Sequence, residues 1–331
     1  MRTRPLGTSG IDASVIGLGT WAISGHCWGG TDEGRSIRAI HRAIDEGINL
    51  IDTAPVYGLG RSEEIVGKAI RDRRDKVVLA TKVGHVWHVK RGRHVFDWQG
   101  KSVYIYLGPE SIEYEIEQSL KRLQTDHIDL YQEHFPDPST PVEDTVATLL
   151  KLKDQGKIRA IGVSNLAVDT LETYLKCGRI DTAQERYNML DRHIESDLLG
   201  KCRELGLAVL AYSPLAQGLL TGKVGTDREF SEGDQRREHS HFSHDCRRRV
   251  MAFLDAIKPV ADSYRLTLAQ LVLAWTASQP GITHLLAGAR DPQQASENAR
   301  AGKVELTTED VNTITATLNA QDFGFTASEM A

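Results

Sequence analysis

Cysteine is scarce in this sequence, and no two cysteines lie close together. The 331 residues include four of them, which are Cys27, Cys177, Cys202 and Cys246. Such wide spacing, without a CxxC pair, does not suggest a disulfide-rich secreted scaffold or a zinc knuckle. The N-terminus lacks an apolar signal core, and no apolar run is long enough to span a bilayer. We therefore expect a cytoplasmic protein with no membrane partner.

The sequence also lacks a large excess of charge of either sign. It has 40 Lys and Arg against 45 Asp and Glu, which is a formal net charge of -5. This balance gives no general electrostatic case for binding nucleic acid or an anionic membrane, although it leaves room for a local anion pocket. No expected strand is followed by a GxGxxG turn with an acidic partner, which disfavours a Rossmann dinucleotide-binding fold.

Short apolar strands alternate with helical patterns along almost the whole chain. The helices are indicated by apolar residues at helical spacing, such as Ile37, Ile40 and Ile44, and by stop signals such as Gly47. The expected strands span residues 15–19, 49–52, 77–81, 128–131, 158–163, 183–185, 208–211 and 282–287.

This alternation predicts an α/β fold of the closed (β/α)₈ TIM-barrel type. Strands separated by helices pair in parallel and are buried on both faces, and eight such units suit a barrel. We expect one domain over residues 1–331, with an N-terminal β-hairpin cap, a long loop at 213–245, additional C-terminal helices and a polar tail. A doubly wound open sheet is the competing architecture.

Four titratable side chains leave the expected strand ends, where the active sites of such barrels lie. Asp52 and Tyr57 follow the second strand, Lys82 the third and His134 the fourth. A phenol with a pKa near about 10 is a poor proton donor at neutral pH. An ammonium group nearby would lower that pKa, and a carboxylate could hold the ammonium. With a histidine to orient the substrate oxygen, the set suits protonation of an alkoxide as a hydride reaches a carbonyl carbon.

Each of these residues also has a plainer explanation. Asp52 could cap the turn that follows its strand, Lys82 could be a solvated charge, and His134 could pack within a loop. Their convergence at the mouth of one predicted barrel favours catalytic use.

Several stretches of the sequence resemble the motifs of the aldo-keto reductase family. They occur in the family's order between about residue 3 and residue 302 and are Gly19–Trp21, Asn49–Gly58, Ala80–Lys82, Tyr131–Asp137, Gly156–Asn165 and Ala211–Leu215. The resemblance implies a barrel that binds a nicotinamide cofactor without a Rossmann domain. It also implies that Tyr57 is the general acid and base, that Lys82 and Asp52 tune it, and that His134 orients the substrate.

The resemblance further implies a path for the cofactor across the barrel mouth. Ser164, Asn165 and Gln184 would hydrogen-bond the carboxamide, Tyr212 would stack on the nicotinamide ring, and the loop at 213–245 would cover the cofactor. The implied cofactor-binding residues are Gly19, Thr20, Trp21, Asp52, Ser164, Asn165, Gln184, Tyr212, Ser213, Pro214, Leu215, Gln217, Gly218, Gly288, Arg290, Gln294 and Asn298.

Arg290 bears on the choice between NADP(H) and NAD(H). A guanidinium can bind a 2′-phosphate through two hydrogen bonds, which favours NADP(H), whereas an ordinary surface arginine would favour neither. Better-known branches of the family have Lys where Gly288 stands and Arg where Gln294 stands. These departures weaken the phosphate site and keep NAD(H) possible.

Two other stretches invite comparison with binding sites. The residues His239 to Cys246 could suggest a metal cluster, but without a second group of ligands a solvated lid is the better interpretation. The basic run Lys90–His94 is interpreted as a loop after the third strand. Four aromatic residues could wall a substrate pocket or simply pack in the fold, namely Trp21, Trp28, Trp87 and Phe135.

The sequence thus predicts an NAD(P)H-dependent oxidoreductase that interconverts aldehydes or ketones and alcohols by hydride transfer. Its partner is a small carbonyl or alcohol substrate, and no metal is expected. The alternatives are a regulatory, channel-subunit-like module that binds the cofactor with little turnover, and a metal-dependent barrel hydrolase. The sequence makes no prediction of the oligomeric state.

Overall fold

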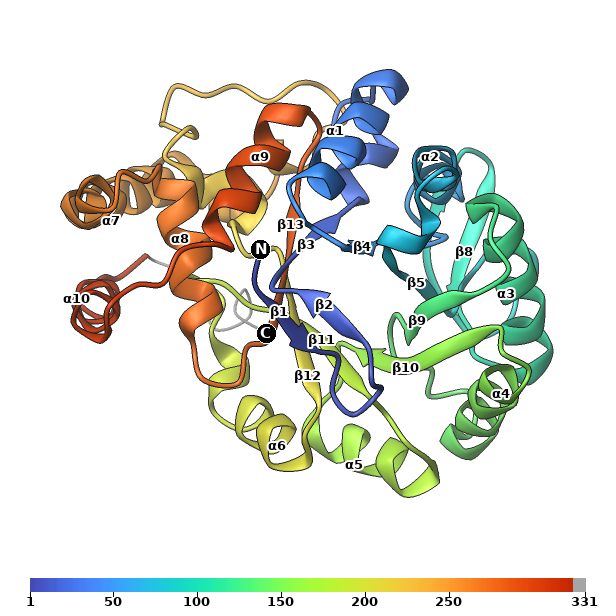
Figure 1. The fold of residues 1–331 in the computed structure, drawn as a ribbon. Helices are drawn as coiled ribbons and strands as arrows, with labels where there is room; N and C mark the ends of the chain where they lie inside the picture. The colour runs from blue at the N-terminus through green and yellow to red at the C-terminus, as the bar shows by residue number, and fades with distance from the viewer. Residues whose placement is uncertain (324–331) are drawn as a thin grey trace.

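The computed structural model describes residues 1–323 and is organised around a closed barrel of eight parallel strands (Figure 1). The predicted (β/α)₈ barrel is confirmed, while most of the expected polar tail lies outside the described residues. Neighbouring strands follow the chain order, and the last pairs with the first. The barrel strands are β3 (Ile16–Gly19), β4 (Leu50–Asp52), β5 (Val78–Val83), β9 (Ile128–Glu133), β10 (Ile158–Ser164), β11 (Thr182–Arg186), β12 (Ala208–Tyr212) and β13 (His284–Gly288).

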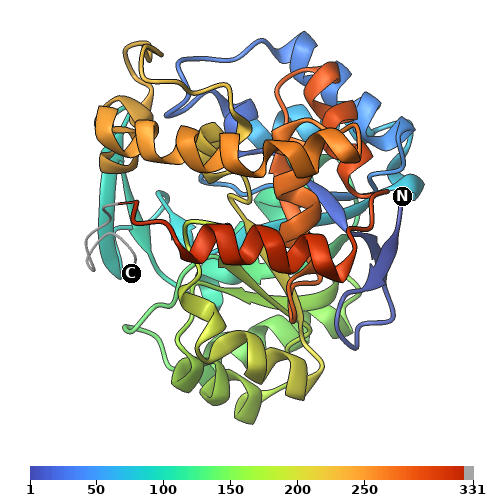
Figure 2. The ribbon, with the colours of Figure 1, turned by 90° about the vertical axis from the view of Figure 1, so that its left-hand side faces the viewer.

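Helices surround the barrel, and two of them are additional to the eight that connect or follow its strands. The additional helices, α7 and α10, lie with α8 on one side of the barrel (Figures 1 and 2). Among the described residues, no helix is long and apolar enough to cross a membrane. The helices are α1 (Glu33–Asp45), α2 (Arg61–Ile70), α3 (Pro109–Leu123), α4 (Val142–Asp154), α5 (Val168–Cys177), α6 (Leu198–Leu205), α7 (His244–Ser263), α8 (Leu268–Ser278), α9 (Pro292–Ala301) and α10 (Thr308–Asn319).

An N-terminal hairpin closes one end of the barrel. Its strands, β1 (Thr3–Pro5) and β2 (Asp12–Ser14), lie across the near end of the barrel in Figure 1. Between the two strands, Leu6 and Ile11 are buried against apolar side chains that fill the barrel interior, including Leu50. Because this end is filled by apolar side chains, the opposite end, where the strands finish, is the one that can accept a ligand.

A three-stranded antiparallel sheet follows β5 and was not predicted. It consists of β6 (His85–Val86), β7 (Arg93–Trp98) and β8 (Lys101–Ile105), so the predicted loop at 90–94 is wrong at its last two residues. The turn between β7 and β8 is Gln99-Gly100, with φ of 49° and 74°. Two positive φ values are what a tight two-residue hairpin requires, and glycine makes the second one easy to adopt.

The long loop after β12 contains three short 3-10 segments. They are η4 (Ala216–Thr221), η5 (Gln235–Arg237) and η6 (Ser240–Phe242). Helix α7 begins at His244 and so includes the last two residues of the predicted loop. Within the histidine-rich stretch, the side chain of His239 accepts a hydrogen bond from the His241 amide and caps η6. Over residues 1–323, no group of three or more His, Cys, Asp or Glu side chains is placed to hold a metal ion.

Candidate active site

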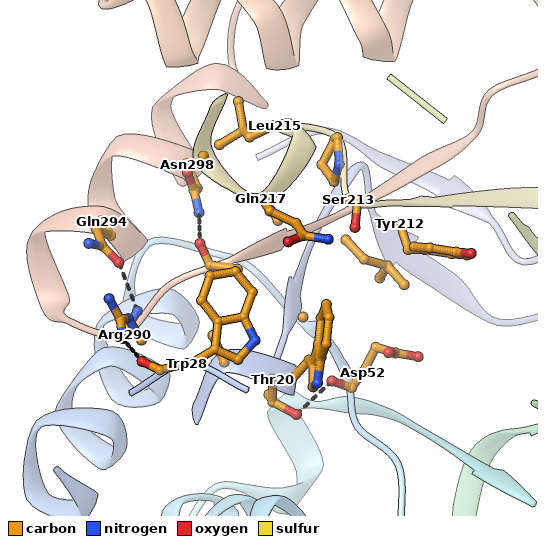
Figure 3. Close-up of a pocket in the computed structure, with 18 of the residues that line it drawn as sticks. Thr20, Trp28, Asp52, Tyr212, Ser213, Leu215, Gln217, Arg290, Gln294 and Asn298 are labelled. Atoms are coloured by element: carbon orange, nitrogen blue, oxygen red, sulfur yellow. Dashed lines mark hydrogen bonds between the residues drawn. The ribbon is translucent and has the colours of Figure 1, made fainter. Parts of the chain in front are cut away.

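A cavity of about 640 Å³ opens at the carboxyl ends of the barrel strands. All of the residues predicted for cofactor binding line it, and so do Tyr57 and His134 (Figure 3). Lys82 does not line the cavity because it lies beneath Asp52 and Tyr57, with only 1% of its surface exposed. The structure therefore brings the predicted catalytic and cofactor residues to one site.

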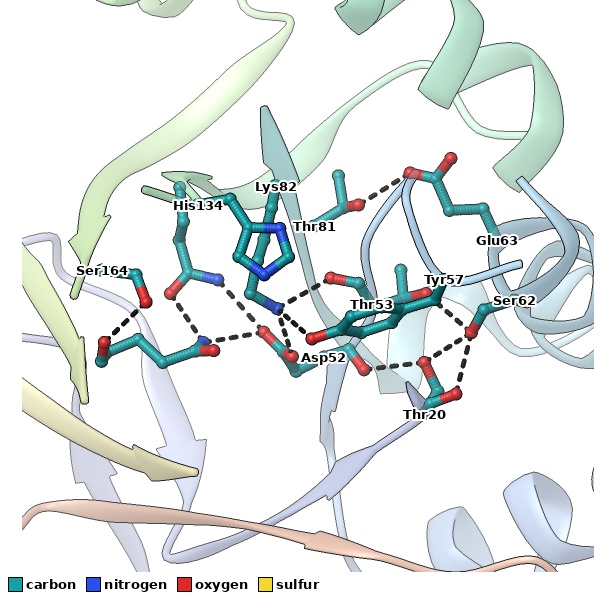
Figure 4. A network of polar contacts seen from close by, with 12 residues as sticks. Thr20, Asp52, Thr53, Tyr57, Ser62, Glu63, Thr81, Lys82, His134 and Ser164 are labelled. Atoms are coloured by element: carbon teal, nitrogen blue, oxygen red, sulfur yellow. Dashed lines mark hydrogen bonds and ion pairs between the residues drawn. The ribbon is translucent and has the colours of Figure 1, made fainter. Parts of the chain in front are cut away.

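The centre of the site is a buried ion pair between Lys82 and Asp52. The Lys82 Nζ donates to Asp52 Oδ1 at 2.6 Å and to the Thr53 carbonyl oxygen at 3.0 Å (Figure 4). Burial lowers the pKa of Lys82, while the neighbouring Asp52 carboxylate acts in the opposite direction. A buried charge persists only where such pairing replaces the lost water, so this pair is fixed in place by its surroundings.

Two glutamine side chains hold the second oxygen of Asp52. Gln132 Nε2 donates to Asp52 Oδ2 at 3.1 Å, and Gln184 Nε2 donates to the same atom at 2.9 Å. Sequence reasoning identified Gln184 as a cofactor contact but missed Gln132. The missed signal was the alternation of side chains along β9, which puts Gln132 on the same inner face as Leu130 and His134.

Tyr57 lies over this ion pair and keeps its proton. Its hydroxyl is 3.5 Å from Lys82 Nζ, and the ammonium lies 5.2 Å from the centre of the ring. Burial raises the pKa of Tyr57 well above its usual value, and the Asp52 carboxylate adds to that increase. The net shift is therefore opposite to the lowering that was predicted, because burial and the Asp52 carboxylate both raise the pKa. The Tyr57 side chain is therefore a protonated phenol, and the phenolate that it would form lies beside the ammonium of Lys82.

His134 faces the phenol across the cavity floor as a neutral imidazole. Its ring centre lies 5.8 Å from that of Tyr57, in an edge-on arrangement. Burial lowers the pKa of His134 well below its usual value, and the nearby His85 and Lys82 lower it further. Asn165 Nδ2 donates to the His134 carbonyl oxygen at 2.9 Å and ties this segment to the end of β10.

The wall formed by β10, β11 and β12 is held by a chain of hydrogen bonds. The Tyr212 hydroxyl donates to Asn165 Oδ1 at 2.8 Å, and Asn165 Nδ2 donates to Ser164 Oγ at 3.0 Å. Ser164 Oγ in turn donates to the Gln184 carbonyl oxygen at 2.6 Å. Because Gln184 uses its amide nitrogen on Asp52, its side-chain oxygen is the atom left to accept a further hydrogen bond.

The far end of the cavity is basic and aromatic (Figure 3). Arg290 Nη1 donates to the Trp28 carbonyl oxygen at 3.2 Å, and its backbone N–H donates to Gln294 Oε1 at 2.9 Å. The indole of Trp28 lies beneath the guanidinium of Arg236 at 4.8 Å. Asn298 Nδ2 donates to the Gly288 carbonyl oxygen at 3.1 Å. The structure thus gathers the residues predicted for the adenosine end of the cofactor.

The aromatic residues divide between the cavity and the hairpin beside it. Trp21, Trp28 and Phe135 line the cavity, with Trp21 and Trp28 packed edge to face at 5.4 Å. Trp87 does not line it, and packs instead with Tyr57 and Phe96 in a small apolar cluster between the site and the β7–β8 hairpin. The unpredicted hairpin therefore supports the segment that carries Tyr57.

Comparison with known sequences relates these features to a protein family. The model of the Aldo/keto reductase family matches residues 15–319. The NADH-specific methylglyoxal reductase of Escherichia coli is 42% identical over 94% of this chain and 96% of its own length.

Solved structures give the same relationship. A glycerol dehydrogenase from Gluconobacter oxydans has a TM-score of 0.87 and 36% identity, covering 98% of this chain and 99% of its own. An aldo-keto reductase from Klebsiella pneumoniae in complex with NADPH has a TM-score of 0.71 and 31% identity, covering 95% and 94%. The predicted class of nicotinamide-dependent carbonyl oxidoreductase is confirmed, and a regulatory module with little turnover finds no support. The chain belongs to the aldo/keto reductase family.

Proposed function

We propose that Tyr57 exchanges a proton with the oxygen of an aldehyde or ketone, with Lys82, Asp52 and His134 acting as its partners. The observation that carries this proposal is the buried Lys82–Asp52 pair at 2.6 Å, with the Tyr57 hydroxyl 3.5 Å from the ammonium, at the floor of an open cavity. A phenol of raised pKa is a weak acid, so it needs a partner that favours its conjugate base during the reaction.

The cavity has the shape and chemistry that a nicotinamide dinucleotide needs. The free Gln184 side-chain oxygen could accept from the carboxamide, and Tyr212 offers a ring held by its bond to Asn165. Ser213 and Gln217 have φ of 53° and 54°, and such left-handed backbone turns aim N–H groups at a phosphate. When bound, the nicotinamide supplies or accepts a hydride at its C4.

Side chains of the protein would then transfer the proton to and from the substrate oxygen. His134, held neutral, can donate a hydrogen bond to the carbonyl oxygen and place it near the Tyr57 hydroxyl. As the oxygen gains negative charge, Tyr57 gives up its proton, and the resulting phenolate is stabilised by the ammonium of Lys82. Asp52 keeps Lys82 charged and in place. In the oxidation direction, the phenolate takes the proton back from the alcohol.

The preferred cofactor of this proposal is NADP(H), with NAD(H) accepted less well. Arg290 has no carboxylate within ion-pair distance among the described residues, so its guanidinium is available to a 2′-phosphate. Lys223 and Arg228 also line the cavity. A relative described as NADH-specific and another solved with NADPH show that the family's cofactor choice varies.

The substrate of this proposal is a small aldehyde or ketone, or the corresponding alcohol, in the cytoplasm. The relatives are named for methylglyoxal and glycerol, both small molecules. The loop from 213 to 243 would cover the bound cofactor, because the Gln235 backbone N–H donates to the Cys27 carbonyl oxygen at 3.2 Å and so joins the loop to the segment of Trp28, which lines the cavity. The Trp28–Asp234 bridge fastens the same two segments.

Turnover of short aldehydes with NADPH tests the proposal directly, by following the absorbance of the reduced cofactor. The Tyr57→Phe variant should lose about 10³-fold or more in kcat, because it removes the phenolic proton beside Lys82 and leaves the ring in place. Tyr264→Phe is a matched control, since it also removes one hydroxyl, one that donates to Asp310 at 2.6 Å and takes no part in the cavity. Near-wild-type kcat in Tyr57→Phe would refute the assignment.

A further inference from the structure

Gln132 lies behind the wall of the cavity and has no part in the function proposed above. It is a fully buried residue of β9, and it does not line the cavity. Its side chain nevertheless contacts two residues that do, Asp52 and Gln184. Any effect of Gln132 on a bound ligand must therefore pass through these two side chains.

The three side chains form a closed triangle of hydrogen bonds. Gln132 Nε2 donates to Asp52 Oδ2 at 3.1 Å, and Gln132 Oε1 accepts from Gln184 Nε2 at 3.0 Å. Gln184 Nε2 also donates to Asp52 Oδ2 at 2.9 Å. A carboxylate only accepts hydrogen bonds, so Asp52, in the middle of the network of Figure 4, requires an N–H group from each glutamine. Both amides are therefore fixed in one orientation.

This arrangement uses both hydrogens of the Gln184 amide nitrogen. One is donated to Asp52 and the other to Gln132, so Oε1 is the atom that Gln184 can offer to a ligand in the cavity. An acceptor in that place matches the NH2 group of a nicotinamide carboxamide and not its carbonyl oxygen. Without Gln132, one N–H of Gln184 would lose its partner, and the amide would be held by Asp52 alone.

Strand β10 leaves the space through which Gln132 reaches Gln184. Gly162 on this strand is in register with Gln132 on one side and with Thr182 of β11 on the other. A Cβ atom at Gly162 would lie 2.7 Å from Gln132 Cγ and 2.4 Å from Thr182 Oγ1, which is too close for atoms that are not bonded. The lack of a side chain at residue 162 thus allows the two glutamines to meet.

A purely structural role explains Gln132 less well. Leu130, two residues earlier on the same face of β9, packs in the apolar interior of the barrel. A methionine or leucine at 132 would fill similar space without burying an amide, whose burial opposes folding unless hydrogen bonds replace the lost water. What the glutamine adds is its pair of hydrogen bonds to Asp52 and Gln184.

We propose that Gln132 is a positioning residue that fixes the orientation of Gln184, and that it thereby selects a carboxamide over other acyl groups on the cofactor ring. This inference rests on the proposed function, in which Gln184 accepts a hydrogen bond from the carboxamide. Gln132 itself would touch neither the cofactor nor the substrate. Its removal should therefore change the choice between ring substituents, which is a property that a merely structural residue would leave alone.

Binding of NADP⁺ and of its acetylpyridine analogue, in which a methyl group replaces the carboxamide NH2, tests this role. Each is titrated into the protein without substrate, and quenching of tryptophan fluorescence gives its Kd, since Trp21 and Trp28 line the cavity. The wild type should bind the analogue about 10-fold more weakly, the effect of one lost hydrogen bond. In Gln132→Met this ratio should fall to about 3-fold or less, because Gln184 can then turn an N–H towards the acetyl oxygen.

Gln279→Met is the matched control and should keep the wild-type ratio. Gln279 is also buried, and its amide donates to the Trp275 carbonyl oxygen at 2.9 Å, outside the cavity. If Gln132→Met does not fold, Gln132→Leu removes the same two hydrogen bonds and should show the same fall.

The ratio of the two Kd values decides between the outcomes. An unchanged ratio in the Gln132 variant, or equal affinity of the wild type for both ligands, would overturn the role of Gln132 and leave the proposed function intact. Failure of the wild type to bind NADP⁺, or to reduce any short aldehyde with NADPH, would instead overturn the proposed function.

Discussion

Two buried aspartates show how the working end of this barrel differs from its base. Asp52, at the mouth, is 2% exposed, and Asp129, near the start of β9 at the other end, is 1% exposed. Asp129 accepts hydrogen bonds from the Leu79 amide at 2.9 Å, from Arg74 at 2.8 Å and from Arg159 at 2.7 Å. Burial and pairing alone therefore do not distinguish a catalytic carboxylate from a structural one.

The difference lies in the cation and in what lies beside it. The partners of Asp129 are arginines, which stay charged at any physiological pH, and their side chains are 19% and 53% exposed. The partner of Asp52 is a lysine, 1% exposed, with a phenol and an open cavity next to it. Only the first pair lies beside a phenol that lines the cavity, so only this pair is placed to act on a proton donor of the site.

Replacement of each aspartate by asparagine should separate the catalytic role of Asp52 from the structural role of Asp129. Asp52→Asn should lower kcat by about 10²-fold, because Lys82 loses the partner that keeps it charged beneath Tyr57. Asp129→Asn should leave kcat unchanged but lower the melting temperature by several degrees, since two arginines and a backbone amide lose their shared acceptor.

Steady-state rates and thermal unfolding of both variants measure these effects. A kcat loss in Asp129→Asn as large as that in Asp52→Asn would show that the loss reports damaged folding rather than an altered ion pair. The comparison would then say nothing about catalysis.

Arg290 adds a third case to the comparison of the two ion pairs, because it is an arginine without a carboxylate partner in the described chain. Arg290→Gln should raise the KM for NADPH relative to that for NADH by about 10-fold or more, the effect of losing a charge-assisted hydrogen bond to the 2′-phosphate. Arg159→Gln, which removes an arginine already paired with Asp129, should leave this ratio unchanged. A constant ratio in Arg290→Gln would mean that the guanidinium serves only to hold the Trp28 segment.

The parts of the structure that were predictable are those that depend on local pattern. Strand and helix periods gave the barrel, and the shared position of strand ends brought Asp52, Lys82 and His134 together. The β7–β8 hairpin was missed although Gln99-Gly100 stood between alternating residues. The pKa of Tyr57 could not be deduced, because it depends on how much water the folded site excludes. Sequence shows that a lysine is near, but only coordinates show that burial raises the pKa of the phenol.

The smallest expected effect concerns Glu133, a buried carboxyl that has neither a lysine nor an arginine partner among the described residues. Both of its oxygens are buried, and burial raises the pKa of Glu133 to about 8; the neighbouring Tyr174 hydroxyl acts in the opposite direction, and Asp137 adds to the increase. The folded protein therefore holds this proton more tightly than the unfolded chain, whose pKa is near 4.5. The associated stability is present below about pH 4.5 and is lost as the pH rises towards 8.

Glu133→Gln removes this titration while keeping the shape of the side chain. Relative to wild type, its melting temperature should rise between pH 5.5 and pH 8.5, by an amount equivalent to about 1–3 kcal/mol. Glu115, whose pKa burial also raises to about 8, titrates in both proteins, so the difference between them isolates Glu133. A difference that stays constant with pH would mean that Glu133 is ionised in the folded state. Burial without a cationic partner would then be an insufficient reason for a carboxyl to keep its proton, and the contrast between Asp52 and Asp129 would rest on the cation alone.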